Sequence, residues 1–151
     1  MKAEKLSSSC AVLHFIASFI LLALLLFLPK VQGAVGDMFT LDGLKYTVLT
    51  EEPVSQAGTV SVQRGSTGIS GDIVIPDSVI NDEINYSVTL IPESAFYNCS
   101  KLTRVAMGDS ITSIGDGAFY LCSNLANIEI PDGVTSIGDS AFYGCRSLAN
   151  I

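Results

Sequence analysis

The sequence predicts a mainly β protein, an α/β solenoid whose coils each contain about 23 residues and whose first coil is capped by an N-terminal β-hairpin. One sequence pattern recurs from residues 88, 111 and 134 of the 151-residue chain. Each copy contains short segments of alternating apolar and polar residues, which are typical of half-buried strands. Two further segments of this kind, joined by Asp42-Gly43, precede the repeats and indicate the hairpin.

The repeats keep one register. The step from residue 88 to 111 equals the step from 111 to 134, and Ala, Phe, Tyr and Cys recur at fixed places in each unit. A fixed period of this length with a Leu-x-x-Ile-x-Ile core is typical of a leucine-rich solenoid, because each coil contributes one short strand and buries its apolar side only against its neighbours. The recurring residues are Ala95, Ala118 and Ala141, Phe96, Phe119 and Phe142, Tyr97, Tyr120 and Tyr143, and Cys99, Cys122 and Cys145.

Each unit divides into two extended segments and a turn. In the middle unit, residues 125–130 alternate as a half-buried strand, with Glu129 pointing outward. Residues 134–137 form a second short extended piece on the opposite side. Residues 116–120 are predicted to form one helical turn with Asp116 as its N-cap. The Phe of each turn then faces the core, and the rings of successive coils form a continuous stack.

A degenerate first coil precedes the three units. Residues 73–78 match the strand segments at 105–110 and 128–133, so the repeats are predicted to begin at residue 71. The step from Ile73 to Val105 is longer than the step from Val105 to Ile128. The additional residues, 79–87, are predicted to form a loop or a small hairpin that bulges from the stack.

Composition divides the chain into three regions. Residues 1–33 have a basic start, an apolar run from Cys10 to Leu28 and a small-residue exit, which predict a signal peptide cleaved before Ala34, with a retained membrane anchor as the alternative. Residues 34–70 are predicted to form the N-terminal β cap, since a hairpin over the first coil shields its apolar end from water. Residues 71–151 hold the leucine-rich repeats, and the third unit is incomplete.

The chain after residue 33 is acidic and lacks histidine. It keeps 5 basic and 14 acidic side chains, and the scattered basic residues argue against nucleic acid, whose phosphates need clustered Lys and Arg. The single histidine, His14, lies in the signal segment, and the chain contains no tryptophan. Ser-His-Asp and Cys-His catalytic arrangements and imidazole metal sites are therefore excluded. We predict that the protein is not an enzyme, has no catalytic residue and needs no cofactor.

Residues 130–148 carry a distinctive copy of the repeated sequence. Ile-Pro-Asp-Gly-Val-Thr-Ser-Ile-Gly-Asp-Ser-Ala-Phe-Tyr-Gly-Cys-Arg-Ser-Leu resembles the repeat of the BspA-like (Treponema-type) leucine-rich repeat family. The resemblance extends over residues 71–151, and residues 36–39 with 43–46 are similar to the cap that precedes such arrays. It implies a secreted or cell-surface protein of bacteria, or of protists that share the repeat, used for adhesion to host proteins or to other cells. No catalytic residue comes with it.

One cysteine recurs in each coil, so disulfide bonds or a thiolate metal site have to be weighed for Cys99, Cys122 and Cys145. Buried free thiols are the favoured interpretation. Three is an odd number, and no Cys-x-x-Cys spacing occurs. Stacked side chains that point the same way also seldom reach the torsion angle of a disulfide.

Two columns of acidic residues also recur. Calcium binding is one interpretation, because hard oxygen ligands suit that ion. Capping and turn formation need the same residues, and the dense Asp-x-Asp-Gly pattern of a calcium loop is absent, so no metal site is predicted. The columns are Glu93, Asp116 and Asp139, and Asp77, Asp109 and Asp132.

These observations predict a secreted or surface-exposed leucine-rich repeat protein that mediates protein–protein binding or adhesion. The candidate binding face is the outward side of the half-buried strands that successive coils place side by side. The expected partner is an extracellular or host protein. The alternative is a structural cap or spacer of a longer multidomain surface protein, with no ligand of its own. The candidate residues are Thr103, Arg104, Ala106, Asn127 and Glu129.

The two ends of the chain predict two further interactions, one with a membrane and one with other copies of the chain. Contact with a membrane is expected only through an uncleaved signal segment. The third unit stops at Ile151 without a C-terminal cap, so we expect the last coil to expose apolar residues and an unpaired strand edge. The sequence therefore predicts a fragment of a longer array that self-associates through this coil.

Overall fold

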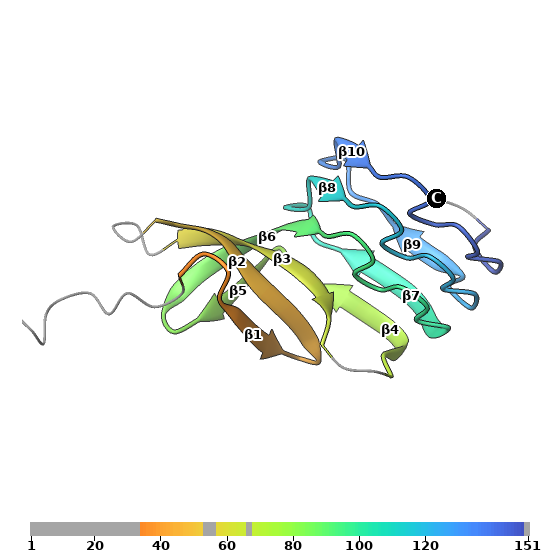
Figure 1. Ribbon diagram of the computed structural model, residues 1–151, viewed down its shortest axis with the longest axis horizontal. Coiled ribbons are helices and arrows are strands. Elements are labelled where there is room, and N and C mark those ends of the chain that lie inside the picture. The colour runs from red at the N-terminus through yellow and green to blue at the C-terminus, as the bar shows by residue number, and fades with distance from the viewer. Residues whose placement is uncertain (1–33, 53–56, 66–67, 150–151) are drawn as a thin grey trace, which may run out of the picture. The chain divides into compact units, whose positions relative to one another are not determined.

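The repeats and the segment before them are built from short strands (Figure 1). The computed structural model describes residues 34–52, 57–65 and 68–149, and no helix occurs among them. The predicted signal segment, residues 1–33, lies outside the described residues. The strands are β1 (Met38–Leu41), β2 (Leu44–Glu52), β3 (Ala57–Arg64), β4 (Ser70–Ile75), β5 (Ser78–Asn81), β6 (Ile84–Ile91), β7 (Lys101–Met107), β8 (Ser113–Ile114), β9 (Asn127–Glu129) and β10 (Ser136–Ile137).

The first two strands form the hairpin that Asp42-Gly43 predicts. Asp42 and Gly43 have φ angles of 49° and 80°, the left-handed backbone that a type I′ turn requires at both central positions. β1 pairs antiparallel with β2, and β2 pairs antiparallel with β3. The ring of Phe39 in β1 stacks on that of Tyr46 in β2, with centroids 5.3 Å apart, so the hairpin has an aromatic inner face.

Two parallel rows of strands run through the repeats. One row continues from β3 through β6, β8 and β10, and the other joins β4, β7 and β9. Leu90 pairs with Ser113 and Ser113 with Ser136, while Arg104 pairs with Asn127. Each partner occupies the same place in the following unit, so equivalent residues of successive units lie side by side. Figure 1 shows the two rows joined by turns.

The insertion at residues 79–87 folds as a hairpin. β5 pairs antiparallel with the first half of β6, and the turn residues Asp82 and Glu83 have left-handed backbone. Ile73 of β4 still pairs with Val105 of β7, its equivalent beyond the insertion. The insertion thus extends one strand of the first coil without disturbing the stacking of the coils that follow.

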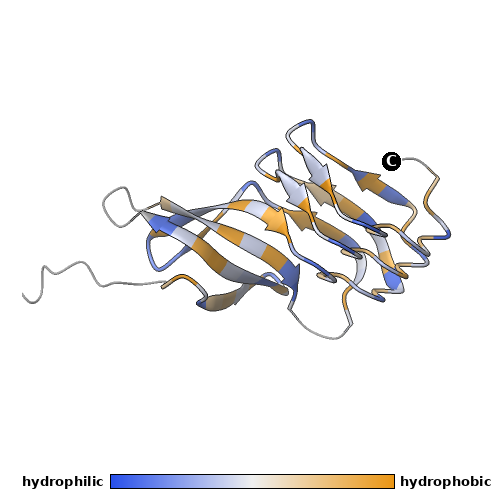
Figure 2. Ribbon diagram, turned by 45° about the horizontal axis from the view of Figure 1, so that its top comes forward, coloured by the Kyte–Doolittle hydropathy of each residue, from blue (hydrophilic) through white to orange (hydrophobic). Residues whose placement is uncertain are grey.

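A column of phenylalanines lies at the centre of the stack. The ring centroids of Phe96 and Phe119 are 5.1 Å apart and those of Phe119 and Phe142 are 5.6 Å apart, with interplanar angles of 3° and 5°. Phe96 and Phe119 are fully buried. Figure 2 shows hydrophobic stretches alternating with polar ones along the strands. Removing one ring from such a core costs about 3–5 kcal/mol.

The helical turn predicted at residues 116–120 is absent. Every second N–H of this turn donates to the next coil, as that of Phe119 does to the carbonyl of Ala141 at 2.8 Å. Gly117 and Leu121 have φ angles of 57° and 60°, and left-handed residues interrupt a right-handed helix. The α part of the predicted α/β solenoid is therefore wrong for the described residues, because hydrogen bonds between coils replace those within a helix.

Asp116 links two coils and does not cap its own turn. Its Oδ1 accepts the N–H of Asp139, 2.9 Å away, and Asp77 Oδ1 accepts the N–H of Ser110 in the same way at 3.1 Å. Gly138 makes the approach possible, since a Cβ there would lie 2.4 Å from the backbone nitrogen of Asp116. The predicted N-cap is thus replaced by a bond across coils.

Candidate functional site

The candidate binding face lies on the sheet formed by β4, β7 and β9. Side chains alternate along these strands, so Leu102, Val105 and Ile128 are buried while most of the residues between them face outward. Parallel pairing aligns the outward residues of neighbouring strands in columns. We call this outer face the strand row, and it consists of Asp72, Val74, Thr103, Arg104, Ala106, Asn127 and Glu129.

The five residues that the sequence singled out lie together on β7 and β9. Thr103, Arg104, Asn127 and Glu129 are exposed, and Ala106 is half-buried. Arg104 is the Cα partner of Asn127, and Ala106 is the Cα partner of Glu129. Arg104 with Asn127, and Ala106 with Glu129, therefore form two adjacent columns on one surface.

Two polar contacts organise the strand row. The hydroxyl of Thr103 donates to Asp72 Oδ1 at 2.8 Å, from a bulge at which Thr103 has no Cα partner on β4. The guanidinium of Arg104 donates to the carboxylate of Glu129, and their side chains are 47% and 58% exposed. An ion pair this exposed adds little to folding stability, but it joins the side chains of neighbouring strands.

The contribution of β4 was missed by the sequence reasoning. Asp72 pairs with Arg104 and Val74 with Ala106, so the row is three strands wide. Val74 is 70% exposed, an apolar side chain in the column that continues with Ala106 and Glu129. The alignment of the degenerate first coil with the later units already contained this signal.

A second exposed column lies on the turns, and we call it the tyrosine ladder: Tyr97, Tyr120 and Tyr143. The ring centroids of Tyr97 and Tyr120 are 5.5 Å apart and those of Tyr120 and Tyr143 are 5.0 Å apart, with interplanar angles of 7° and 21°. The two outer rings are 41% and 61% exposed, and Tyr120 is half-buried between them. The sequence predicted that the Phe of each turn faces the core, but it did not single out the recurring tyrosines as an exposed column.

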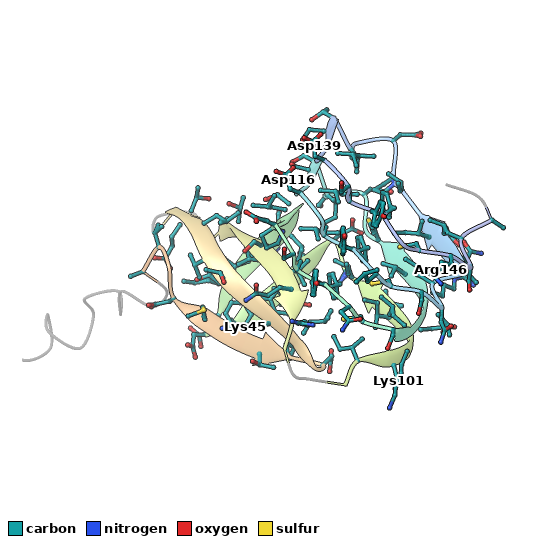
Figure 3. All side chains as sticks on the ribbon, turned by 45° about the vertical axis from the view of Figure 1, so that its right-hand side comes forward. Lys45, Lys101, Asp116, Asp139 and Arg146 are labelled. Carbon is teal, nitrogen blue, oxygen red and sulfur yellow. The ribbon has the colours of Figure 1, made fainter. Side chains whose placement is uncertain are left out.

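The acidic residues of the turns lie apart from several basic residues. Figure 3 shows Asp116 and Asp139 beside each other, whereas Lys45, Lys101 and Arg146 lie elsewhere on the surface. Within residues 34–149, as far as the structure describes them, no group of three or more His, Cys, Asp or Glu is arranged to hold a metal ion. The carboxylate of Asp116 serves instead as a hydrogen-bond acceptor between coils.

The cysteines of the three units, Cys99, Cys122 and Cys145, are free thiols. The thiol of Cys122 donates to the carbonyl of Phe96 in the preceding coil at 3.1 Å. Interaction with Cys122 and, after it, with the Arg64 guanidinium outweighs burial and lowers the pKa of Cys99 to about 6. Interaction with Cys99 and burial raise the pKa of Cys122. These thiols therefore serve as hydrogen-bonding groups between coils.

The periodic stack agrees with a known family of repeats. The family model described as a BspA type leucine-rich repeat region, with six copies, matches residues 76–151, which is half of the chain. The chain belongs to the BspA-type leucine-rich repeat family. The resemblance to this family is thereby confirmed over residues 76–151, and a mainly β fold with parallel sheets is confirmed as well.

Solved structures of other leucine-rich repeat proteins share the BspA-type fold of this chain. A leucine-rich repeat protein from Bacteroides ovatus is 33% identical, covers 75% of the chain and has a TM-score of 0.63. The leucine-rich repeat protein of T. pallidum is 31% identical and covers 75% of the chain, with a TM-score of 0.56. A leucine-rich cell surface protein from Faecalibacterium prausnitzii is 26% identical and covers 76%, with a TM-score of 0.61. The chain is therefore related to bacterial leucine-rich repeat proteins of the cell surface.

The BspA-type chain is shorter than these three proteins. It spans 28% of the Bacteroides structure, 48% of the T. pallidum structure and 30% of the Faecalibacterium structure. No curated protein sequence matches it at a significant level. In the part of the chain that the structure describes, no helix is long and apolar enough to cross a membrane.

Proposed function

We propose that this BspA-type repeat protein is a secreted or surface-exposed binding module whose strand row contacts an extracellular or host protein. The observation that carries the proposal is the row itself, in which parallel strands hold columns of exposed side chains on a continuous sheet. Stacked repeats create extended binding surfaces of this kind. The relationship to a leucine-rich cell surface protein supports the proposed location.

The composition of the strand row suits a protein partner. Val74 and Ala106 are Cα partners that place apolar surface within the row, with Asp72, Arg104 and Glu129 beside them in the aligned columns. Interfaces commonly combine an apolar centre with a polar rim. Because the polar groups are already held by contacts within the row, little ordering is needed when a partner binds.

We also propose that residues 34–70 cap the first coil. β3 pairs in parallel with β6 and so adds one strand to the sheet that continues through β8 and β10. At the end of β3, Arg64 donates its N–H to the carbonyl of Ala95 at 3.1 Å and its guanidinium to the carbonyl of Tyr97. In the next coil, the equivalent carbonyl of Ala118 accepts an N–H from the preceding coil. Arg64 thus supplies donors at a point where no earlier coil provides them.

The proposal also assigns a role to residues 1–33 and to residues 71–151. Residues 1–33 act as the export signal, and residues 71–151 form the repeat region that carries the binding face. We expect no catalytic activity, since leucine-rich repeat regions usually bind partners and the activity of a fold depends on the groups placed on it.

A structural role is the second candidate function. The chain spans less than half of each of the three solved structures reported above. Coils at the start of such a long array would act as a cap or spacer, and the ligand would bind elsewhere in the longer protein.

A pull-down with extracellular-matrix proteins distinguishes the two functions. Arg104→Glu reverses a charge within the strand row, and Arg146→Glu makes the same change at an exposed residue outside it. We expect Arg104→Glu to weaken binding about tenfold or more and Arg146→Glu to leave binding nearly unchanged. Failure to capture any matrix protein, or capture that neither substitution alters, would favour the spacer.

A further inference from the structure

The tyrosine ladder is an aromatic surface that exists before any partner arrives. Tyr97 and Tyr143 are 41% and 61% exposed, and both rings stack on Tyr120. The backbone around the ladder is fixed by bonds between coils, such as that from the N–H of Phe96 to the carbonyl of Ala118 at 2.7 Å. Rings held in this way lose little conformational freedom on binding, and tyrosine is enriched at interfaces.

Leu121 adds an apolar side chain beside the ladder in an unfavourable backbone conformation. Its φ angle is 60°, in the left-handed region, where the equivalent residues are Asn98 and Gly144. Asparagine and glycine tolerate this conformation, whereas leucine rarely adopts it. Leu121 Cδ2 lies 2.7 Å from the point where a Cβ on Gly144 would stand, so the side chain lies across that glycine toward the coil of Tyr143. Strained residues of this kind cluster at binding sites.

The residues of the turns that carry the ladder include negative charge and no positive charge, while the guanidinium of Arg64, from β3, donates to the backbone carbonyl of Tyr97 at one end of the ladder. One exposed carboxylate occurs four residues before each tyrosine, and Lys and Arg are absent from residues 92–98, 115–121 and 138–144. Figure 3 shows two of these carboxylates beside each other, away from the labelled basic residues. A partner of opposite charge is therefore complementary to this surface. The carboxylates belong to Glu93, Asp116 and Asp139.

We propose that the tyrosine ladder binds an extended segment of a partner protein that carries Lys or Arg side chains. The apolar stems of these side chains pack against the ring edges and Leu121, while their charged ends reach the carboxylates and the phenolic oxygens. A sugar ligand is less suited, because sugars stack on ring faces and stacking within the ladder leaves only the outer faces of Tyr97 and Tyr143 uncovered by another ladder ring. This surface lies on the turns and is separate from the strand row.

Two labelled peptides test the proposal on the purified full chain. One alternates Lys with Thr and the other alternates Glu with Thr, and fluorescence anisotropy measures their affinity. We expect the basic peptide to bind about tenfold tighter or more. The chain has no tryptophan, and Tyr46 and Tyr86 are buried, so a change in tyrosine emission reports on the ladder. Equal affinity for both peptides, or tyrosine emission that binding leaves unchanged, would overturn the proposal.

A matched pair of double variants separates local charge from net charge. Glu93→Gln with Asp139→Asn removes two carboxylates from the turns that carry the ladder and leaves the hydrogen-bond acceptor Asp116 intact. Asp82→Asn with Glu83→Gln removes the same two charges from the β5–β6 turn. We expect about a fivefold loss of affinity for the basic peptide in the first variant and less than about twofold in the second. Equal losses would mean that only net charge matters, which contradicts a site at the ladder.

Variants of the rings test the aromatic contribution. Tyr97→Ser with Tyr143→Ser is expected to weaken binding of the basic peptide about tenfold. If that variant does not fold, Tyr→Phe at all three positions keeps the stacking and removes the hydroxyls, with an expected loss of about threefold. Unchanged affinity in the folded ring variant, or an equal loss on Arg104→Glu, would refute the assignment. Preferential binding to a neutral polysaccharide over the basic peptide would show that the occupant is a glycan.

Discussion

In the proposed cap of the first coil, a single side chain, Arg64, terminates the stack of repeats. It stands at the end of β3, and its guanidinium donates to the carbonyl of Tyr97 and contacts the thiol of Cys99. Hydrogen bonds from a charged donor are stronger than neutral ones. Arg64 therefore stabilises the N-terminal end of the repeats by satisfying groups that later coils satisfy for one another.

Replacing Arg64 tests this role at the residue scale. Arg64→Met keeps most of the apolar stem and removes the donors, so we expect a loss of about 1.5–3 kcal/mol in the free energy of unfolding. Arg104→Met removes an exposed guanidinium whose ion pair should contribute less than about 1 kcal/mol. Equilibrium unfolding in urea measures both variants. A loss no larger for Arg64 than for Arg104 would show that Arg64 does not close the stack.

The positions of some single residues could be predicted from the sequence, and those of others could not. The positions of Phe96 and Phe119 in the stack follow from identical residues at a constant period, and Glu129 points outward as the strand alternation predicts. Arg64 belongs to no repeat, and its carbonyl partner on Tyr97 is 33 residues away, so no local pattern could reveal it. The inward direction of the phenylalanines was predicted, but the stacking of Tyr97, Tyr120 and Tyr143 on the surface was not.

At the scale of elements, the turns depend on close contact between coils. The sequence of residues 116–120 is compatible with one helical turn, but every second N–H pairs with the next coil instead. A single isolated helical turn is unfavourable because it fixes several residues for one hydrogen bond. Bonds to a neighbouring coil require no such nucleus, and they require a backbone without a Cβ where Gly138 meets Asp116.

Adding a methyl group at that contact tests the arrangement of the turns. A Cβ on Gly138 would lie 2.3 Å from Asp116 Oδ1 and 2.4 Å from its backbone nitrogen, so we expect Gly138→Ala to cost about 3 kcal/mol. A Cβ on Gly133 would lie 3.0 Å from its nearest neighbour, the carbonyl of Asp109, and Gly133→Ala should cost about 1 kcal/mol. Thermal melts compare the two variants. Equal shifts, or a larger shift for Gly133→Ala, would contradict the close stacking of the turns.

At the scale of the whole molecule, stacking of the coils places one aromatic column inside and another outside. Parallel pairing brings equivalent residues of successive units together, so the phenylalanines stack in the core and the tyrosines stack on the surface. Each coil buries its apolar side only against its neighbours, and its stability therefore depends on theirs. The outer surfaces, the strand row and the tyrosine ladder, are consequences of the same stacking.

The most direct test of this account compares two neighbouring aromatic residues of the middle unit. Phe119 is fully buried and Tyr120 is half-buried on the surface column. We expect Phe119→Ala to lower the free energy of unfolding by about 3–5 kcal/mol and Tyr120→Ala by about 1 kcal/mol, measured by equilibrium denaturation. Equal losses, or a larger loss for Tyr120→Ala, would contradict the assignment of the phenylalanines to the core and the tyrosines to the surface.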